Sequence, residues 1–163
     1  MAWANSGLYA STLAASLTLG TNAPNWNSTA NKFYLTNNSD VTNYAAALAS
    51  SIYSATNEVS GTGWAAGGIA VSALAAGSTS MAPTTTVSGT SPVLMVWGMT
   101  NNLSVASTTL SSIYGGYFYN TVTTNYKIIG IYFGGTAYAT VAGTFAVTWS
   151  SGQVATINVA STA

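Results

Sequence analysis

Side chains able to carry out acid–base or nucleophilic chemistry are scarce in this chain. Its 163 residues include no histidine, cysteine or arginine, and side-chain charge is confined to Lys32, Asp40, Glu58 and Lys127. A glycosidase-type pair of carboxylic acids would have to be Asp40 and Glu58, the only two acids present. Asp40 follows a turn, where an acid serves equally well as a helix cap. A Ser–Lys pair would use Lys32 or Lys127, but no motif singles out one serine among many.

Metal and cofactor sites are not indicated either. The two acids lack the regular spacing of a calcium-binding loop. The glycine-rich stretch of residues 58–68 lacks the lysine of a phosphate-binding loop. We therefore expect no enzymatic activity, no catalytic residues, no metal and no cofactor.

Composition restricts the partners of this chain. Charged residues make up 2% of the sequence and the formal net charge is zero, whereas soluble domains average about 25% charged residues. Nucleic acids and anionic membranes require clustered Lys or Arg, so we expect neither as a partner. No apolar run reaches the roughly 18 residues of a spanning helix, and the first residues lack the positive region of a signal peptide. A neutral surface of this kind favours association, so we expect the protein to belong to an assembly.

A glycine-rich segment separates a helical pattern from a series of strand patterns. Its glycines allow positive φ angles or close approach of another segment. We predict that Glu58 accepts backbone N–H bonds and holds this turn, the alternative being a contact with a neighbouring subunit. Lys127 is expected either to pair with Glu58 or to extend into solvent. The residues of the predicted structural turn are Glu58, Gly61, Gly63, Trp64, Gly67 and Gly68.

Hydrophobic periodicity predicts two helices and a series of strands. The helices span residues 6–17 and 44–53, and Asp40 or Thr42 would cap the second. The strands span residues 32–36 with one solvated face, 69–74, 93–97, 110–119 with a bulge or sharp bend at Gly115–Gly116, 126–133, 144–149 and 154–159. The last two form a predicted hairpin, and residues 75–92 a linker that is β-prone at 84–87. The expected fold is a single mainly β (α+β) domain over residues 1–163, an antiparallel β-sandwich or jelly-roll-like fold with two short helices in its N-terminal third.

Aromatic residues are abundant, with ten tyrosines and five tryptophans. The strand patterns place Trp97, Trp149, Phe133 and Phe145 in the core. Four tyrosines are candidates for an interface, because an aromatic body with a polar tip suits a protein surface. Aromatic platforms also bind sugars, so a carbohydrate-binding module is a competing interpretation. The candidate interface residues are Tyr34, Tyr126, Tyr132 and Tyr138.

The order of several landmarks resembles a family of small virion structural proteins of tailed bacteriophages. The landmarks are Trp3 and Tyr9, Lys32-Phe-Tyr-Leu35, Glu58-Val-Ser-Gly-Thr-Gly-Trp-Ala-Ala-Gly-Gly68, Val96-Trp97, Phe133-Gly-Gly135 and the closing strand from Gly143 to Trp149. The resemblance spans most of the chain and implies a β-rich particle component, without catalytic residues. This sequence departs from the family pattern in its scarcity of charge.

The expected function is that of a capsid decoration (cement) protein at the virion surface. Its partners would be the major capsid protein and other copies of itself, held by apolar, aromatic and neutral hydrogen-bonding contacts. The alternative is a tail or fibre-tip protein that recognises a host surface glycan. A secreted or surface-layer-like structural module is a third possibility.

Overall fold

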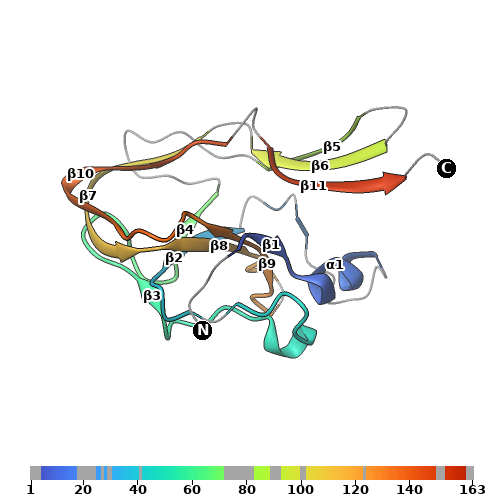
Figure 1. The fold of residues 1–163 in the computed structure, drawn as a ribbon, viewed down its shortest axis with the longest axis horizontal. Helices are drawn as coiled ribbons and strands as arrows, with labels where there is room; N and C mark the ends of the chain where they lie inside the picture. The colour runs from blue at the N-terminus through green and yellow to red at the C-terminus, as the bar shows by residue number, and fades with distance from the viewer. Residues whose placement is uncertain are drawn as a thin grey trace.

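The fold is built mainly from antiparallel strands, with one short α-helix in the part of the chain described (Figure 1). The computed structural model describes residues 5–17, 25–26, 28, 31–40, 42–71, 83–88, 93–99, 102–122, 124–149 and 153–160. Within these ranges no helix has the length and apolar character needed to cross a membrane. The predominance of antiparallel strands confirms the predicted β-rich class.

The described chain forms eleven strands, one α-helix and a 3-10 turn. The strands are β1 (Gly7–Leu8), β2 (Lys32–Thr36), β3 (Glu58–Val59), β4 (Ile69–Ala70), β5 (Pro83–Ser88), β6 (Val93–Met99), β7 (Leu103–Ile113), β8 (Gly115–Tyr119), β9 (Lys127–Tyr132), β10 (Tyr138–Val147) and β11 (Gln153–Ala160). Helix α1 spans Ala10–Leu17 and the 3-10 turn, η1, spans Leu48–Ser50. The largest sheet has six strands in the order β1-β9-β8-β2-β3, and β4 pairs with the other end of β2. Two smaller sheets join β7 to β10 and β11 to β6 to β5.

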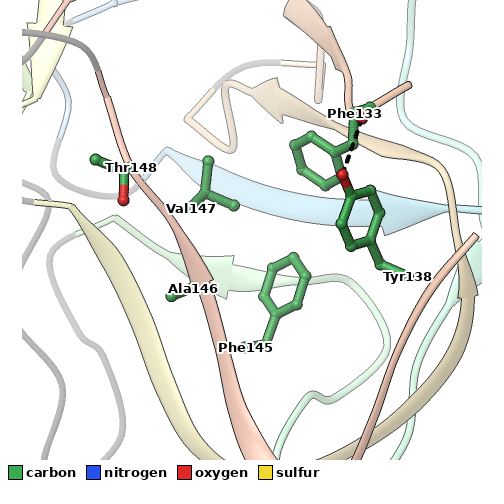
Figure 2. A pocket seen from close by; sticks show the side chains of 6 residues that line it. All are labelled: Phe133, Tyr138, Phe145, Ala146, Val147 and Thr148. Atoms are coloured by element: carbon green, nitrogen blue, oxygen red, sulfur yellow. Dashed lines mark hydrogen bonds between the residues drawn. The ribbon is translucent and has the colours of Figure 1, made fainter. Parts of the chain in front are cut away.

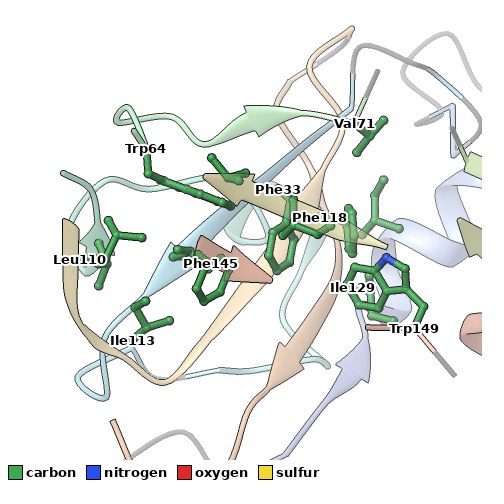
Figure 3. Close-up of a cluster of buried hydrophobic side chains, with 14 of the residues drawn as sticks. Phe33, Trp64, Val71, Leu110, Ile113, Phe118, Ile129, Phe145 and Trp149 are labelled. Atoms are coloured by element: carbon green, nitrogen blue, oxygen red, sulfur yellow. The ribbon is translucent and has the colours of Figure 1, made fainter. Parts of the chain in front are cut away.

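The main apolar core covers one face of the six-stranded sheet (Figure 3). Phe33 of β2 lies opposite Phe118 of β8, and their ring centroids are 4.6 Å apart. Trp97 of β6 packs edge-on against Phe118 at 5.2 Å. Leu103 and Val105 of β7 are buried in the same cluster. Since side chains alternate along a strand, the neighbours of Phe33 and Phe118 point to the opposite face.

That opposite face corrects one expectation about β2. The strand spans the predicted residues, but the face expected to be solvated is buried: Tyr34 and Thr36 each retain 1% exposure. Tyr9, Tyr44 and Tyr53 pack over it. Ala10 N–H donates to the carbonyl of Tyr44, and Tyr53 N–H donates to that of Asn125. Alternation of polar and apolar residues therefore marked two different buried environments, one of them lined by tyrosine.

The predicted helix at residues 44–53 is wrong. Only η1 is helical there, so the described N-terminal third contains one α-helix rather than two. Its backbone groups pair with distant segments, since Lys127 N–H donates to the carbonyl of Ser51 and Ile52 bridges to Tyr126. Tertiary contacts override the helix propensity of the alanines. The predicted helix at 6–17 forms only from Ala10, because Gly7 and Leu8 pair with β9 as β1.

The predicted C-terminal hairpin is also wrong. Both strands form, but β10 pairs with β7 and β11 pairs with β6. Periodicity identifies a strand without naming its partner, and both partners here are distant in sequence. The β-prone residues 84–87 form β5, and the bend expected at Gly115–Gly116 falls at Tyr114, between β7 and β8. Residues 72–74 of the strand predicted at 69–74 lie outside the described residues.

Candidate functional site

The glycine-rich segment joins two strands that pair with opposite ends of β2. Glu58 of β3 lies opposite Thr36, and Ala70 of β4 lies opposite Lys32. Gly68 has a φ of +69°, and a Cβ atom there would lie 2.2 Å from the carbonyl oxygen of Phe33. The segment thus approaches β2 more closely than a residue with a side chain would permit.

Glu58 fastens this segment at two points. Its Oε1 accepts the N–H of Gly67 at 2.7 Å, and its Oε2 accepts the hydroxyl of Tyr53 at 2.6 Å. Trp64, at the tip of the segment, is buried in the main core 5.5 Å from the ring of Phe145. Gly61 pairs with Trp64 in an isolated bridge, and Gly63 has a φ of +74°. The segment is held by a carboxylate on one side and by an indole ring on the other.

Seven tyrosines form a second cluster on the face of the six-stranded sheet away from the main core. Tyr34 of β2 and Tyr117 of β8 lie opposite each other with their rings stacked at 5.3 Å. Tyr53 stacks on Tyr119 at 4.9 Å. We call this group the tyrosine layer; its members are Tyr9, Tyr34, Tyr44, Tyr53, Tyr117, Tyr119 and Tyr132.

Every charged side chain of the protein lies at the tyrosine layer. Asp40 accepts the hydroxyl of Tyr117 in a short hydrogen bond, and Thr42 contacts the same hydroxyl at 2.6 Å. The ammonium nitrogen of Lys127 lies 4.3 Å from the centre of the Tyr117 ring, within the range of a cation–π interaction. Lys32 pairs with Tyr119 across β2 and β8, and Glu58 contacts Tyr53.

Lys127 therefore does neither of the two things expected of it. Instead of pairing with Glu58 or extending into solvent, it lies among the rings of Tyr9, Tyr34 and Tyr117. Burial lowers its pKa, and the charge of Asp40 opposes that change. The reason is the register of β9: Lys127 lies opposite Tyr119 at a bulge, which directs it to the tyrosine face.

The pKa values of the buried tyrosines change in the opposite direction to that of Lys127, since they are raised. Burial raises the pKa of Tyr119 to about 12, with a further contribution from the charge of Glu58. Burial also raises the pKa of Tyr117, helped by the neighbouring phenol of Tyr9, whose ionisation would compete with that of Tyr117, and by the hydrogen bond to Asp40. Desolvation penalises the charged form in each case. The protonated phenols act as hydrogen-bond donors, Tyr117 to Asp40 and Tyr119 to the carbonyl of Gly67.

The four tyrosines expected at an interface lie in different environments. Tyr34 and Tyr126 are 1% and 8% exposed, so the expectation that they lie at the surface of the chain is wrong. Tyr132 is partly buried against the tyrosine layer. Tyr138 is 52% exposed at the start of β10. Tyr34 lies in a strand that is buried on both faces, and Tyr126 pairs with Ile52 in an isolated bridge. Local alternation does not reveal such covering segments.

An aromatic groove opens beside Tyr138 (Figure 2). Its volume is about 230 Å³. The ring of Phe133 lies 6.2 Å from those of Tyr138 and Phe145, which come from the start and the end of β10. The other lining residues are Ala146, Val147 and Thr148. No charged group lines the groove, so it suits an apolar or neutral group.

The sequence did not predict the tyrosine layer as a site. One signal was present, since Lys32, Tyr34 and Thr36 alternate along β2 and Tyr117 and Tyr119 alternate along β8. The contacts of Asp40 and Lys127 with Tyr117 join residues 77 and 10 positions apart along the chain, and no local pattern encodes them. In the described residues, no group of three or more His, Cys, Asp or Glu is placed to hold a metal ion. No known protein family, curated protein or solved structure matches this chain.

Proposed function

We propose that the chain is a decoration protein of a tailed-bacteriophage capsid. It binds the outside of the shell formed by the major capsid protein and stabilises that shell against internal pressure. The family resemblance of its landmarks supports this location at the virion surface. The observation that carries the proposal is the distribution of charge: all four charged side chains lie at the tyrosine layer, and β5, β6, β7, β10 and β11 contain none.

The uncharged strands provide a surface for attachment without ion pairs. β10 presents exposed Tyr138 and Val141, and the aromatic groove lies beside it. Among the described strands β10 pairs only with β7, and an added strand from a capsid subunit would pair along its other edge. Attachment then rests on buried apolar area and neutral hydrogen bonds.

We also propose that the sheets form the two layers of a β-sandwich. Trp97 of β6 and Phe145 of β10 reach the core that covers the six-stranded sheet, through Phe118 and Trp64. Buried residues of β7 complete the contact. A core shared in this way between facing sheets is the arrangement of a sandwich.

The proposal assigns no reaction to the chain. Asp40 and Glu58 each bind a tyrosine hydroxyl, at Tyr117 and Tyr53. Hydrogen bonds that hold the carboxylates in place account for both acids as structural groups. Both acids are thus accounted for by their contacts with tyrosines, and the proposal needs no pair of catalytic carboxylates.

Copy number in purified particles tests the proposal. Quantitative mass spectrometry gives the ratio of this chain to the major capsid protein. Decoration predicts near-stoichiometric abundance, in the hundreds of copies per particle. A handful of copies would instead place the chain in the tail or portal region, and finding none would overturn the virion assignment.

The second candidate is a tail or fibre-tip protein that recognises a host glycan. The aromatic groove favours it, because Phe133, Tyr138 and Phe145 offer aromatic surface beside an exposed hydroxyl. A glycan array separates the candidates. Saturable binding to one sugar class, lost in Tyr138→Ala, favours recognition, whereas a blank array with high copy number favours decoration.

A further inference from the structure

Both carboxylates of the chain accept a hydrogen bond from a phenol of the tyrosine layer. Tyr117 donates to Asp40, and Tyr53 donates to Glu58 at 2.6 Å. These are the only two side-chain acids in the sequence. A carboxylate differs from a carbonyl or an amide as an acceptor, because it can take the proton as well as share it. Two phenols of the layer therefore have a proton acceptor within hydrogen-bond distance.

Two other phenols lie between these and have no such acceptor. Tyr119 donates its hydroxyl to the carbonyl of Gly67 at 2.7 Å. The hydroxyl of Tyr34 is buried without a hydrogen-bond partner among the described residues. An unpaired buried hydroxyl costs free energy, and phenylalanine would serve the packing of the ring equally well. A phenol gives up an electron far more readily than a phenyl ring does, and this difference offers a reason for tyrosine at the position.

The four rings form a continuous series from the surface to the interior. Half-buried Tyr53 stacks on Tyr119, with ring centroids 4.9 Å apart. Tyr119 meets Tyr34 edge-on at 5.6 Å, and Tyr34 stacks on Tyr117 at 5.3 Å. Electrons transfer readily between aromatic rings that pack this closely. The series therefore joins the two phenols that have a carboxylate partner.

Tyr117 is the point at which a second series of rings meets the first. Half-buried Tyr44 packs edge-on against Tyr9 at 5.2 Å, and the ring of Tyr9 lies 6.1 Å from that of Tyr117. Tyr117 itself is fully buried. The ammonium group of Lys127 lies over its ring and disfavours a positive charge there. Loss of an electron from Tyr117 is therefore favoured when the phenol proton leaves with it, and Asp40 is placed to accept that proton.

We propose that the tyrosine layer is a redox site, which donates an electron to a one-electron oxidant such as a peroxyl radical and holds the resulting radical at Tyr117. Tyr117 loses one electron through the series of rings, and its hydroxyl proton moves to the carboxylate of Asp40. The products are a neutral tyrosyl radical, a protonated Asp40 and a hydroperoxide anion, which takes a proton from water. Burial protects the tyrosyl radical from coupling with a second one. This activity does not depend on the proposed location in a virion.

Flash oxidation of the full chain tests the proposal, with a ruthenium tris-bipyridine complex photo-oxidised by a cobalt(III) complex as the one-electron oxidant. The absorbance of the tyrosyl radical gives its lifetime, which should exceed that of the radical formed on free tyrosine. Tyr117→Phe should abolish the long-lived radical. Asp40→Asn keeps a hydrogen-bond acceptor but removes the base, so it should abolish the long-lived radical as well. Tyr138→Phe is the matched control, since it removes an exposed phenol outside the layer and should leave the lifetime unchanged.

Interrupting both series of rings distinguishes a redox role from a structural one. The double variant Tyr34→Phe/Tyr9→Phe keeps both rings packed, but phenylalanine does not pass the electron on. It should lose the long-lived radical while thermal unfolding shows that it is folded, although Tyr117 and Asp40 are unchanged. If Tyr117→Phe does not fold, Asp40→Asn and the double variant decide the question. A radical in the unmodified chain that decays as fast as that of free tyrosine would overturn the proposal, and so would a long-lived radical that survives in either of these two variants.

Discussion

The ammonium group of Lys127 lies 4.3 Å above the ring of Tyr117, whose hydroxyl donates to Asp40. One phenol therefore contacts a cation with its face and an anion with its edge. The negative face of an aromatic ring and its polar O–H suit these two partners. Two opposite charges are thereby accommodated within a mostly buried layer of tyrosines, on the face of the sheet away from the main core.

Removing the Tyr117 hydroxyl should destabilise the fold. Tyr117→Phe removes the hydroxyl that Asp40 and Thr42 share, and the loss of a hydrogen bond to a charged group costs about 1.5–3 kcal/mol, with the lower end expected for this partly buried pair. Tyr34→Phe is the matched control, since the Tyr34 hydroxyl is buried with no hydrogen-bond partner among the described residues. Its removal should be neutral or stabilising. Urea unfolding of both variants measures the difference, and equal midpoints would contradict the assigned role of Tyr117.

Stability should fall steeply above about pH 10, where tyrosine ionises in the unfolded chain. Burial raises the pKa of five tyrosines above that value in the folded state, so the unfolded state loses protons first. Each tyrosine that stays protonated contributes a slope of up to about 1.4 kcal/mol per pH unit, and a partly exposed ring such as that of Tyr53 contributes less. The lowered pKa of Lys127 acts in the opposite sense, because there the folded state loses its proton first. The five tyrosines outnumber that single amine.

Tyrosinate absorbance during an alkaline titration checks this expectation. Ionisation of the five tyrosines should coincide with unfolding followed by circular dichroism. Tyr138→Phe, which removes an exposed phenol, should leave the unfolding transition in place. A titration in which all ten tyrosines ionise near pH 10 while the chain stays folded would contradict the tyrosine layer.

Close approach at Gly68 should make that position intolerant of any side chain. Gly68→Ala combines a φ of +69° with a Cβ 2.2 Å from the Phe33 carbonyl oxygen, so we expect a loss of about 3 kcal/mol or more. Gly135→Ala is the control, because its added Cβ would lie 3.6 Å from the nearest atom, the Tyr132 hydroxyl. Thermal unfolding of both variants compares them. A small effect at Gly68 would mean that β4 does not pair with β2 as described.

Retention on particles should be nearly independent of salt and only weakly dependent on pH. Screening acts on charges that the uncharged strands lack, so NaCl between about 0.05 M and about 1 M should not release the protein. Between about pH 5 and pH 9 the chain has no histidine or cysteine to titrate. Pelleting of particles after each wash measures the bound fraction. Release by salt alone would count against attachment through neutral contacts.

Strand patterns were readable from the sequence where one side of the strand packs in the main core. Phe33 and Leu35 alternate with polar neighbours, and this predicted β2 correctly, as the apolar run at 93–97 predicted β6. The same alternation predicted that the other face of β2 is solvated, which is wrong. Tyr34 on that face has a polar hydroxyl, which suggests exposure, but its large ring is buried. Covering segments far along the chain decide between these outcomes.

The failures share a physical cause, which is that pairing is not local. Tyr44, Leu48 and Ile52 have helical spacing, yet the backbone around them bonds to β9 and α1 instead. The strand after Ser150 follows a turn-like sequence, yet β11 pairs with β6 rather than with β10. For the candidate sites, the landmarks at Glu58 and Tyr138 were visible, whereas the partners of Asp40 and Lys127 depend on the register of β8 and β9.

The positions of the two lysines determine where trypsin can cleave this chain. Trypsin cleaves after Lys or Arg, and its sites here are Lys32, which begins β2, and Lys127, which begins β9. Both peptide bonds belong to hydrogen-bonded strands of the six-stranded sheet, so cleavage requires that sheet to open. Tryptic digestion therefore reports on the opening of one sheet, and the lifetime of the intact chain in trypsin measures how firmly the tyrosine layer keeps it closed.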